Sequence, residues 1–205
     1  MAITSIKTGS SFTNLQKYND FLGPNSAYIP SSFESIATAT GTGSSGTITF
    51  SSIPSTYSSL QIRILGKNTA TSTGRRSAVL QFNSDTANNY VAYHNLYGDG
   101  TSATADAATT YNGCLVSYMF ASSGAGFTNM FGTAIIDIHD YATTTKNKTV
   151  RAFGGVNVNS ATATEQAVTL HSSLWLSTAA INSISVKTDG SNWASGTVVS
   201  LYGIN

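Results

Sequence analysis

Charge and cysteine are both scarce in this chain. Charged residues make up 9% of its 205 residues, and the formal net charge is +1. Proteins that bind nucleic acids usually carry a basic patch, so this balance gives no reason to expect a nucleic-acid partner. The only cysteine, Cys114, excludes an intrachain disulfide and favours folding in a reducing cytosol. Low charge does not indicate disorder here, because 40% of the residues are apolar and they recur periodically.

Long apolar runs are missing as well. The first residues, MAITSIKTGSSF, contain no apolar core of the kind that a secretory signal needs. No apolar run approaches the roughly 18 residues of a membrane-spanning helix. We therefore expect no secretion by a signal peptide and no membrane insertion.

The residues that usually build a reaction centre are few and scattered. Glutamate occurs only at Glu34 and Glu165, so no carboxylate pair stands out for glycoside hydrolysis. None of the three histidines has a second histidine or a cysteine at metal-ligand spacing; they are His94, His139 and His171. We therefore expect neither a metal nor any other cofactor.

One acid/base cluster can still be drawn from the sequence, from Asp137, His139 and Asp140. No G-x-S-x-G elbow accompanies it, so a polar strand end is the favoured interpretation. Asp85 is a weak candidate for a metal ligand, and the acidic loop Asp99–Asp106 lacks the spacing of a calcium loop. The sequence thus predicts a protein that is not an enzyme.

The run Thr47–Leu65 is the clearest architectural signal that the chain does contain. Leu60, Ile62 and Ile64 alternate with Gln61 and Arg63, which is the pattern of a half-buried strand. A shorter alternating strand precedes it. The connector between them carries a proline that cannot donate to a strand ladder, and its Ile53 and Tyr57 are expected to plug the open end of a sandwich.

The same pattern recurs from residue 35 to the C-terminus. We expect strands near 35–41, 46–50, 60–66, 78–82, 90–97, 113–121, 129–138, 149–157, 166–176, 183–188 and 197–204. Many short strands with Gly-rich turns are typical of an antiparallel β-sandwich of the jelly-roll kind. Apolar residues on both faces of the last strand predict that it is covered on both sides.

Three connecting stretches carry further predictions. The long loop Gly98–Asn112 has little to bury and is expected to be exposed and mobile. The segment Phe82–Tyr90 is rich in Asn and Asp, which make Asx turns, so it is expected to be a rigid turn that fixes a strand pair. The basic pair Arg75-Arg76 is expected to lie in a turn, where it either meets solvent or contacts an acidic neighbouring subunit.

Residues 1–34 have a different pattern from the rest. Phe12, Leu15, Tyr18, Phe21 and Leu22 recur at steps of three or four, which predicts a short amphipathic helix. Such a helix is marginal alone, so its apolar stripe needs another surface. The stripe either folds back on the chain's own sandwich or anchors the protein to a partner. We divide the chain accordingly into an anchor and linker, 1–34, and a sandwich domain, 35–205.

Trp193 lies in a loop of Gly, Ser, Asn and Asp, as aromatic residues often do on sugar-binding surfaces. With Asn192 and Asp189 it forms a candidate contact for a receptor or glycan. The alternative is that Trp193 closes the end of the sandwich or packs at a subunit interface.

Four stretches together resemble a known group of proteins: Tyr18–Thr40, Phe50–Arg63, Gln81–Gly100 and Val198–Asn205. Their order and spacing are similar to those of tailed-bacteriophage virion proteins described as tail fibre, receptor-binding or minor structural proteins. In that group a short N-terminal segment precedes a jelly-roll-like sandwich, and the chain closes on an LYGI-type strand. These motifs are structural, and none of them is a catalytic signature.

The resemblance implies a non-enzymatic virion protein, assembled in the cytoplasm of a bacterial host. It implies a homotrimer that attaches to other virion proteins through residues 1–34 and presents its sandwich to a host-surface glycan or protein. A capsid decoration or head-fibre protein is the close alternative. A free carbohydrate-binding module or a small glycan-active enzyme is a second class, which the missing signal peptide and carboxylate pair disfavour.

Overall fold

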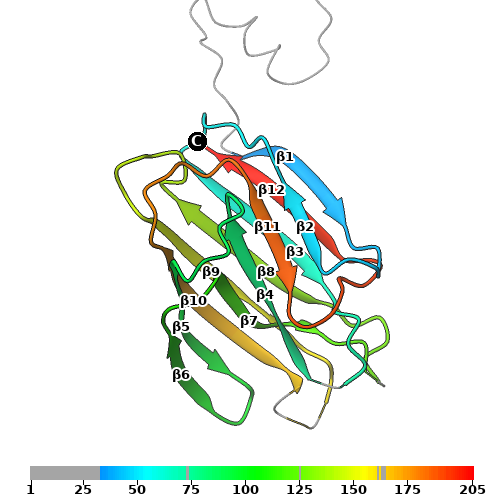
Figure 1. The fold of residues 1–205 in the computed structure, drawn as a ribbon. Helices are drawn as coiled ribbons and strands as arrows, with labels where there is room; N and C mark the ends of the chain where they lie inside the picture. The colour runs from blue at the N-terminus through cyan, green and yellow to red at the C-terminus, as the bar shows by residue number, and fades with distance from the viewer. Residues whose placement is uncertain (1–32, 73, 125, 161, 163–164) are drawn as a thin grey trace, which may run out of the picture. The chain divides into compact units, whose positions relative to one another are not determined.

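The computed structural model describes residues 33–205 except 73, 125, 161, 163 and 164. These residues are all-β and fill one compact unit, Phe33–Asn205 (Figure 1). The strands are β1 (Phe33–Thr40), β2 (Thr47–Phe50), β3 (Ser59–Gly66), β4 (Arg75–Phe82), β5 (Tyr90–Gly98), β6 (Ala103–Ala108), β7 (Cys114–Ala121), β8 (Gly132–His139), β9 (Lys148–Val156), β10 (Ala167–Trp175), β11 (Ile184–Thr188) and β12 (Val198–Ile204).

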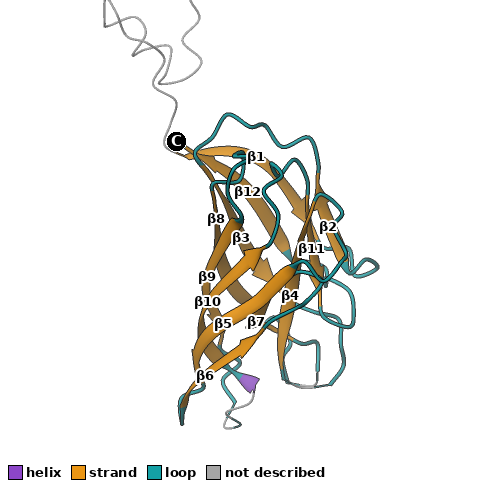
Figure 2. Ribbon diagram, turned by 60° about the vertical axis from the view of Figure 1, so that its left-hand side comes forward, coloured by secondary structure: helices purple, strands orange, loops and turns teal. Residues whose placement is uncertain are grey.

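The strands form two antiparallel sheets that lie face to face (Figure 2). The large sheet has the order β1-β12-β3-β8-β9-β10-β5-β6, and the small sheet has the order β2-β11-β4-β7. From β1 to β4 the chain changes sheet at every strand. The pairs β5–β6 and β9–β10 both join the large sheet, which therefore extends beyond the four strands of the small one.

The core lies between the sheets and follows from the alternation of apolar side chains. In β3, Leu60, Ile62 and Ile64 are buried at 0%, 0% and 3% exposure, as the sequence predicts. Arg63 faces outward, and its guanidinium carbon lies 5.0 Å from the ring centroid of Tyr202. The expected two-sided burial of the last strand is found on one side only: Val199 and Leu201 are fully buried, whereas the opposite face is half-buried.

The predicted plug at the end of the sandwich is present. Ile53 is 6% exposed and belongs to the core, and the half-buried Tyr57 packs against that core. The Tyr57 ring lies directly on the backbone of Gly203, where a Cβ atom would come within 2.3 Å of the ring. A side chain at position 203 would therefore displace the ring.

The Asn-rich turn is held by hydrogen bonds, but it joins strands of opposite sheets rather than a pair. Asn83 and Ser84 have φ values of 52° and 58°, a conformation that Asn tolerates better than most residues. The Asn83 amide donates to Ala180 O at 2.8 Å, and its oxygen accepts the Asn182 N–H at 2.9 Å. β4 pairs with β11 and β7, whereas β5 pairs with β10 and β6.

Two loop predictions are wrong in part. The stretch Gly98–Asn112 is largely exposed, but it contains the edge strand β6, whose backbone pairs with β5. Arg75 and Arg76 begin strand β4 instead of lying in a turn. In both cases pairing with a neighbouring strand decides the conformation, and the local side-chain pattern does not indicate it. The predicted N-terminal helix lies outside the described residues.

Candidate functional site

The outer face of the large sheet carries a row of exposed apolar side chains. Cross-strand register places Ile135 beside Phe153, Phe153 beside Leu170, and Leu170 beside Leu96. We call these four residues the apolar row. Each of them is between 45% and 55% exposed, although large apolar side chains are usually buried. Single exposed apolar residues are ordinary, but a contiguous row across four neighbouring strands marks a contact surface.

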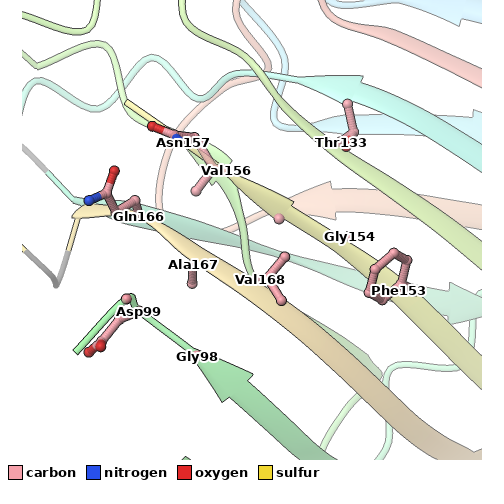
Figure 3. A pocket seen from close by; sticks show the side chains of 12 residues that line it. Gly98, Asp99, Thr133, Phe153, Gly154, Val156, Asn157, Gln166, Ala167 and Val168 are labelled. Carbon is pink, nitrogen blue, oxygen red and sulfur yellow. The ribbon is translucent and has the colours of Figure 1, made fainter. Parts of the chain in front are cut away.

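A second row runs parallel to the first, displaced from it by two residues on each strand. It consists of Thr133, Gly155, Val168 and Gly98, and we call it the glycine row. A hollow of about 510 Å³ lies over this row on the outer face; position 98 is open, whereas a Cβ atom at Gly155 would come within 2.3 Å of Ala167 O. Phe153 and Thr133 lie at one end of this hollow, and the side chains of Asp99, Asn157 and Gln166 gather at the other (Figure 3).

Asp99 gives the polar end of the hollow a fixed negative charge. Its carboxylate accepts hydrogen bonds from the backbone N–H groups of Thr101 and Ser102, both at 2.9 Å. These bonds stabilise the ionised form and lower the pKa of Asp99 from 3.8 to about 2. The carboxylate is thus ionised at every ordinary pH.

A polar strip flanks the apolar row on its other side. Here a second hollow, of about 420 Å³, is lined by His94, His139 and Arg151 together with Leu96 and Leu170. Arg151 donates to Asp137 at 3.3 Å, but its side chain remains 60% exposed. An ion pair this open contributes little to stability, so Arg151 is available to another partner.

A cluster of tyrosines lies where β5 of the large sheet meets β7 of the small one. The ring centroids of Tyr97 and Tyr118 are 4.9 Å apart, and the Arg75 guanidinium carbon lies 4.4 Å from the Tyr118 centroid. Tyr118 has a φ of 60°, which is rare for a bulky residue and indicates local strain. The Tyr93 hydroxyl donates to Asp106 at 3.2 Å.

Behind this cluster lies a buried amide without a partner. Asn95 shares a face of β5 with Tyr93 and Tyr97 and is 7% exposed. Neither polar atom of its side chain has a hydrogen-bond partner among the described residues. A buried amide left unsatisfied costs about 1–3 kcal/mol, and an internal water is the usual partner of such a group.

The Trp193 ring, predicted as a receptor or glycan contact, is 0% exposed in the core. It meets Phe120 edge-on at 5.3 Å, and its indole N–H donates to Val186 O at 3.1 Å. A surface contact through this ring is therefore wrong, because the ring belongs to the core of the sandwich. The sequence predicted an exposed ring because the residues next to Trp193 along the chain are polar, whereas the ring packs against the apolar core in space.

The other two residues of that candidate site remain at the surface. Asp189 is exposed, and Asn192 is half-buried with its amide donating to Gly43 O at 3.2 Å. Asp189 and Asn192 remain candidates for a receptor contact, but the Trp193 ring cannot contribute to it. The predicted anchor residues lie outside the described residues; they are Phe12, Leu15, Tyr18, Phe21 and Leu22.

The acidic residues considered as catalytic or metal-binding are tied into local structure. Asp140 pairs with Lys146 at 3.2 Å, with both side chains largely exposed. Burial alone would raise the pKa of Asp85, but hydrogen bonds from Trp175, Asn89 and Ala87 outweigh it and lower that pKa. Across the part of the chain that the structure describes, no group of three or more His, Cys, Asp or Glu residues could hold a metal ion.

Sequence comparison adds no family to these observations: no protein-family model matches the chain, and no curated protein matches it significantly. Within the described residues there is no helix with the length and apolar character needed to cross a membrane.

Proposed function

We propose that this chain is a non-enzymatic structural protein of a tailed-bacteriophage particle, a tail fibre or receptor-binding protein. In this proposal residues 1–34 attach it to other virion proteins, and the sandwich meets the host surface. A capsid decoration or head-fibre protein is the alternative within the same class.

The observation that carries the proposal is the apolar row on the outer face of the large sheet. A protein that acts by contact needs a broad surface that loses water on assembly, and four half-exposed apolar side chains provide one. Near this face the Asp99 carboxylate is engaged in a turn, and Arg151 forms an open ion pair with Asp137. This arrangement favours a role in assembly or recognition over a role in catalysis.

We further infer a jelly roll as the specific kind of sandwich. Setting aside the two inserted strand pairs, the large sheet has the order β1-β12-β3-β8, and it faces β2-β11-β4-β7. Strands from the two halves of the chain thus interleave in both sheets, which supports a jelly-roll arrangement. The inserted strands β5, β6, β9 and β10 carry most of the apolar row and both hollows, so they supply the contact surfaces.

The attachment step can be tested with particles and two forms of the protein. Full-length chain and a chain of residues 33–205, which keeps β1 whole, are each mixed with particles that lack the protein, and particles are then sedimented. The proposal expects only the full-length chain to sediment, with both forms showing the same β-type circular dichroism. Equal sedimentation of both forms would refute attachment through residues 1–34.

A second candidate function, a carbohydrate-binding module, is favoured by the tyrosine cluster. Aromatic faces with polar groups at their edges suit sugar rings, and the unsatisfied Asn95 amide lies beside them. A glycan array tests this candidate. Binding that is lost in Tyr97→Ala but kept in Tyr57→Ala would support it, and an array without any bound glycan would count against it.

A further inference from the structure

The apolar row and the glycine row have complementary shapes. In the apolar row large side chains project from β9 and β5, at Phe153 and Leu96. Two residues further along the same strands the glycine row has Gly155 and Gly98, and the hollow lies over this row. The hollow therefore lies beside Phe153, and position 98, beside Leu96, is open to an incoming side chain.

We propose that this face binds a second copy of the chain through a two-fold symmetric contact. The two-fold axis lies in the contact plane, runs perpendicular to the strands and passes between the apolar row and the glycine row. Such an axis turns the face over and exchanges the rows while each strand stays opposite its own counterpart. Phe153 of one copy then enters the hollow above Gly155 of the other, and Leu96 lies above Gly98. The inference rests on the proposed function only in taking this face as an assembly surface.

The charges of the face agree with this arrangement. The same rotation that exchanges the two rows also brings the polar strip beyond the apolar row over the polar end of the hollow. His94 of one copy thereby comes over the turn that holds Asp99 of the other. Arg151 comes over Asn157, two strands or about 10 Å from Asp99, a distance that its long side chain can largely cover. Asp99 is ionised, and the Arg151 side chain is 60% exposed, so both are free to take part in such a contact. Opposite charges at the edges of an apolar contact favour one register over others.

The size of the face also suits a second copy. The six strands from β3 to β6 span about 24 Å at 4.8 Å per strand, and four rows of side chains span about 20 Å. Each copy would thus cover on the order of 500 Å² in projection, which approaches the roughly 800 Å² per partner of a stable interface once side-chain relief is included. This two-fold pairing differs from the homotrimer that the family resemblance implies.

The test is the mass of the purified protein by light scattering, from about 1 μM to about 100 μM. The proposal expects a species of twice the 21.4 kDa chain mass that dissociates on dilution. Leu170→Ser should raise its Kd at least about tenfold, because a symmetric contact contains the residue twice. Leu176→Ser is the matched control: Leu176 is 51% exposed, against 48% for Leu170, but it lies one residue past the end of β10, about 20 Å from Leu170 along the strand direction.

A second variant tests the hollow itself. A Cβ atom at Gly98 would have only Ser102 O within 4 Å, at 3.7 Å, so Gly98→Val should fold normally. The valine side chain would occupy the space that Leu96 of the other copy enters, so Gly98→Val should also weaken the dimer. Circular dichroism checks that Leu170→Ser and Gly98→Val keep the wild-type fold.

Several results would overturn the proposal. A trimer would contradict the two-fold axis, and equal effects of Leu170→Ser and Leu176→Ser would contradict the location. A monomer at every concentration would exclude a second copy. If a chain of residues 33–205 then associated, the occupant of the face would be the chain's own first 32 residues. These outcomes are independent of whether the protein is found on a particle, so the proposed function can fail or stand separately.

Discussion

Neighbouring isoleucines on β8 provide a matched test of which sheet face is buried. Ile136 is 0% exposed and lies between Ile62 of β3 and Ala152 of β9. Ile136→Ala removes buried methyl groups from a site held by hydrogen-bonded strands on both sides, so little collapse can fill the cavity. We expect a loss of about 2–5 kcal/mol in the free energy of unfolding. In a domain of this size that loss lowers Tm by about 4–20 °C.

Ile135→Ala makes the same chemical change one residue earlier, on the opposite face. Ile135 is 45% exposed, so the variant loses about half of the burial energy of an isoleucine, or roughly 1 kcal/mol. Urea unfolding of both variants, followed at low protein concentration where the chain is monomeric, gives the comparison. Equal losses in the two variants, or a larger loss in Ile135→Ala, would refute the assignment of the two sheet faces.

Three further predictions concern other parts of the molecule. Trp193→Ala should cost about 3–5 kcal/mol in urea unfolding, because the ring is fully buried; a loss near zero would place the ring at the surface. The depressed pKa of Asp99 means that its stabilising hydrogen bonds are complete above about pH 4 and are lost as the pH falls towards 2. The NMR amide shifts of Thr101 and Ser102 should follow that titration, and shifts that change only near pH 4 would contradict it. EDTA and a reductant should leave Tm unchanged, since the described residues contain no metal-ligand group and Cys114 has no cysteine partner; a clear fall in EDTA would reveal a missed site.

The sequence predicts the strands well wherever apolar and polar residues alternate. β3 and β8 begin and end close to the predicted residues because their alternation matches a sheet with one buried face. β6 was not predicted, because ATADAA carries no large apolar side chain. Its backbone hydrogen bonds to β5 create the strand, and a side-chain pattern cannot indicate them.

Burial decided by distant contacts could not be predicted. Lys148 would be expected at the surface, yet it is 0% exposed, and its Nζ donates to the carbonyls of Thr143, Lys146 and Thr178. The apolar row could not be predicted for the same reason, because it depends on contacts between residues that are distant in the sequence. In the strands that contain Phe153 and Leu170, buried and exposed positions alternate. Only the pairing register between the strands shows that these two exposed side chains lie side by side.

Immunogold electron microscopy of purified phage particles tests the central claim most directly. An antibody against the sandwich, residues 35–205, is applied to particles from a lysate in which the chain is produced. The account predicts gold at a fixed position on intact particles, at a tail fibre, tail tip or capsid surface. The account would be contradicted if gold were absent from the particles while the same antibody detected the protein free in the lysate.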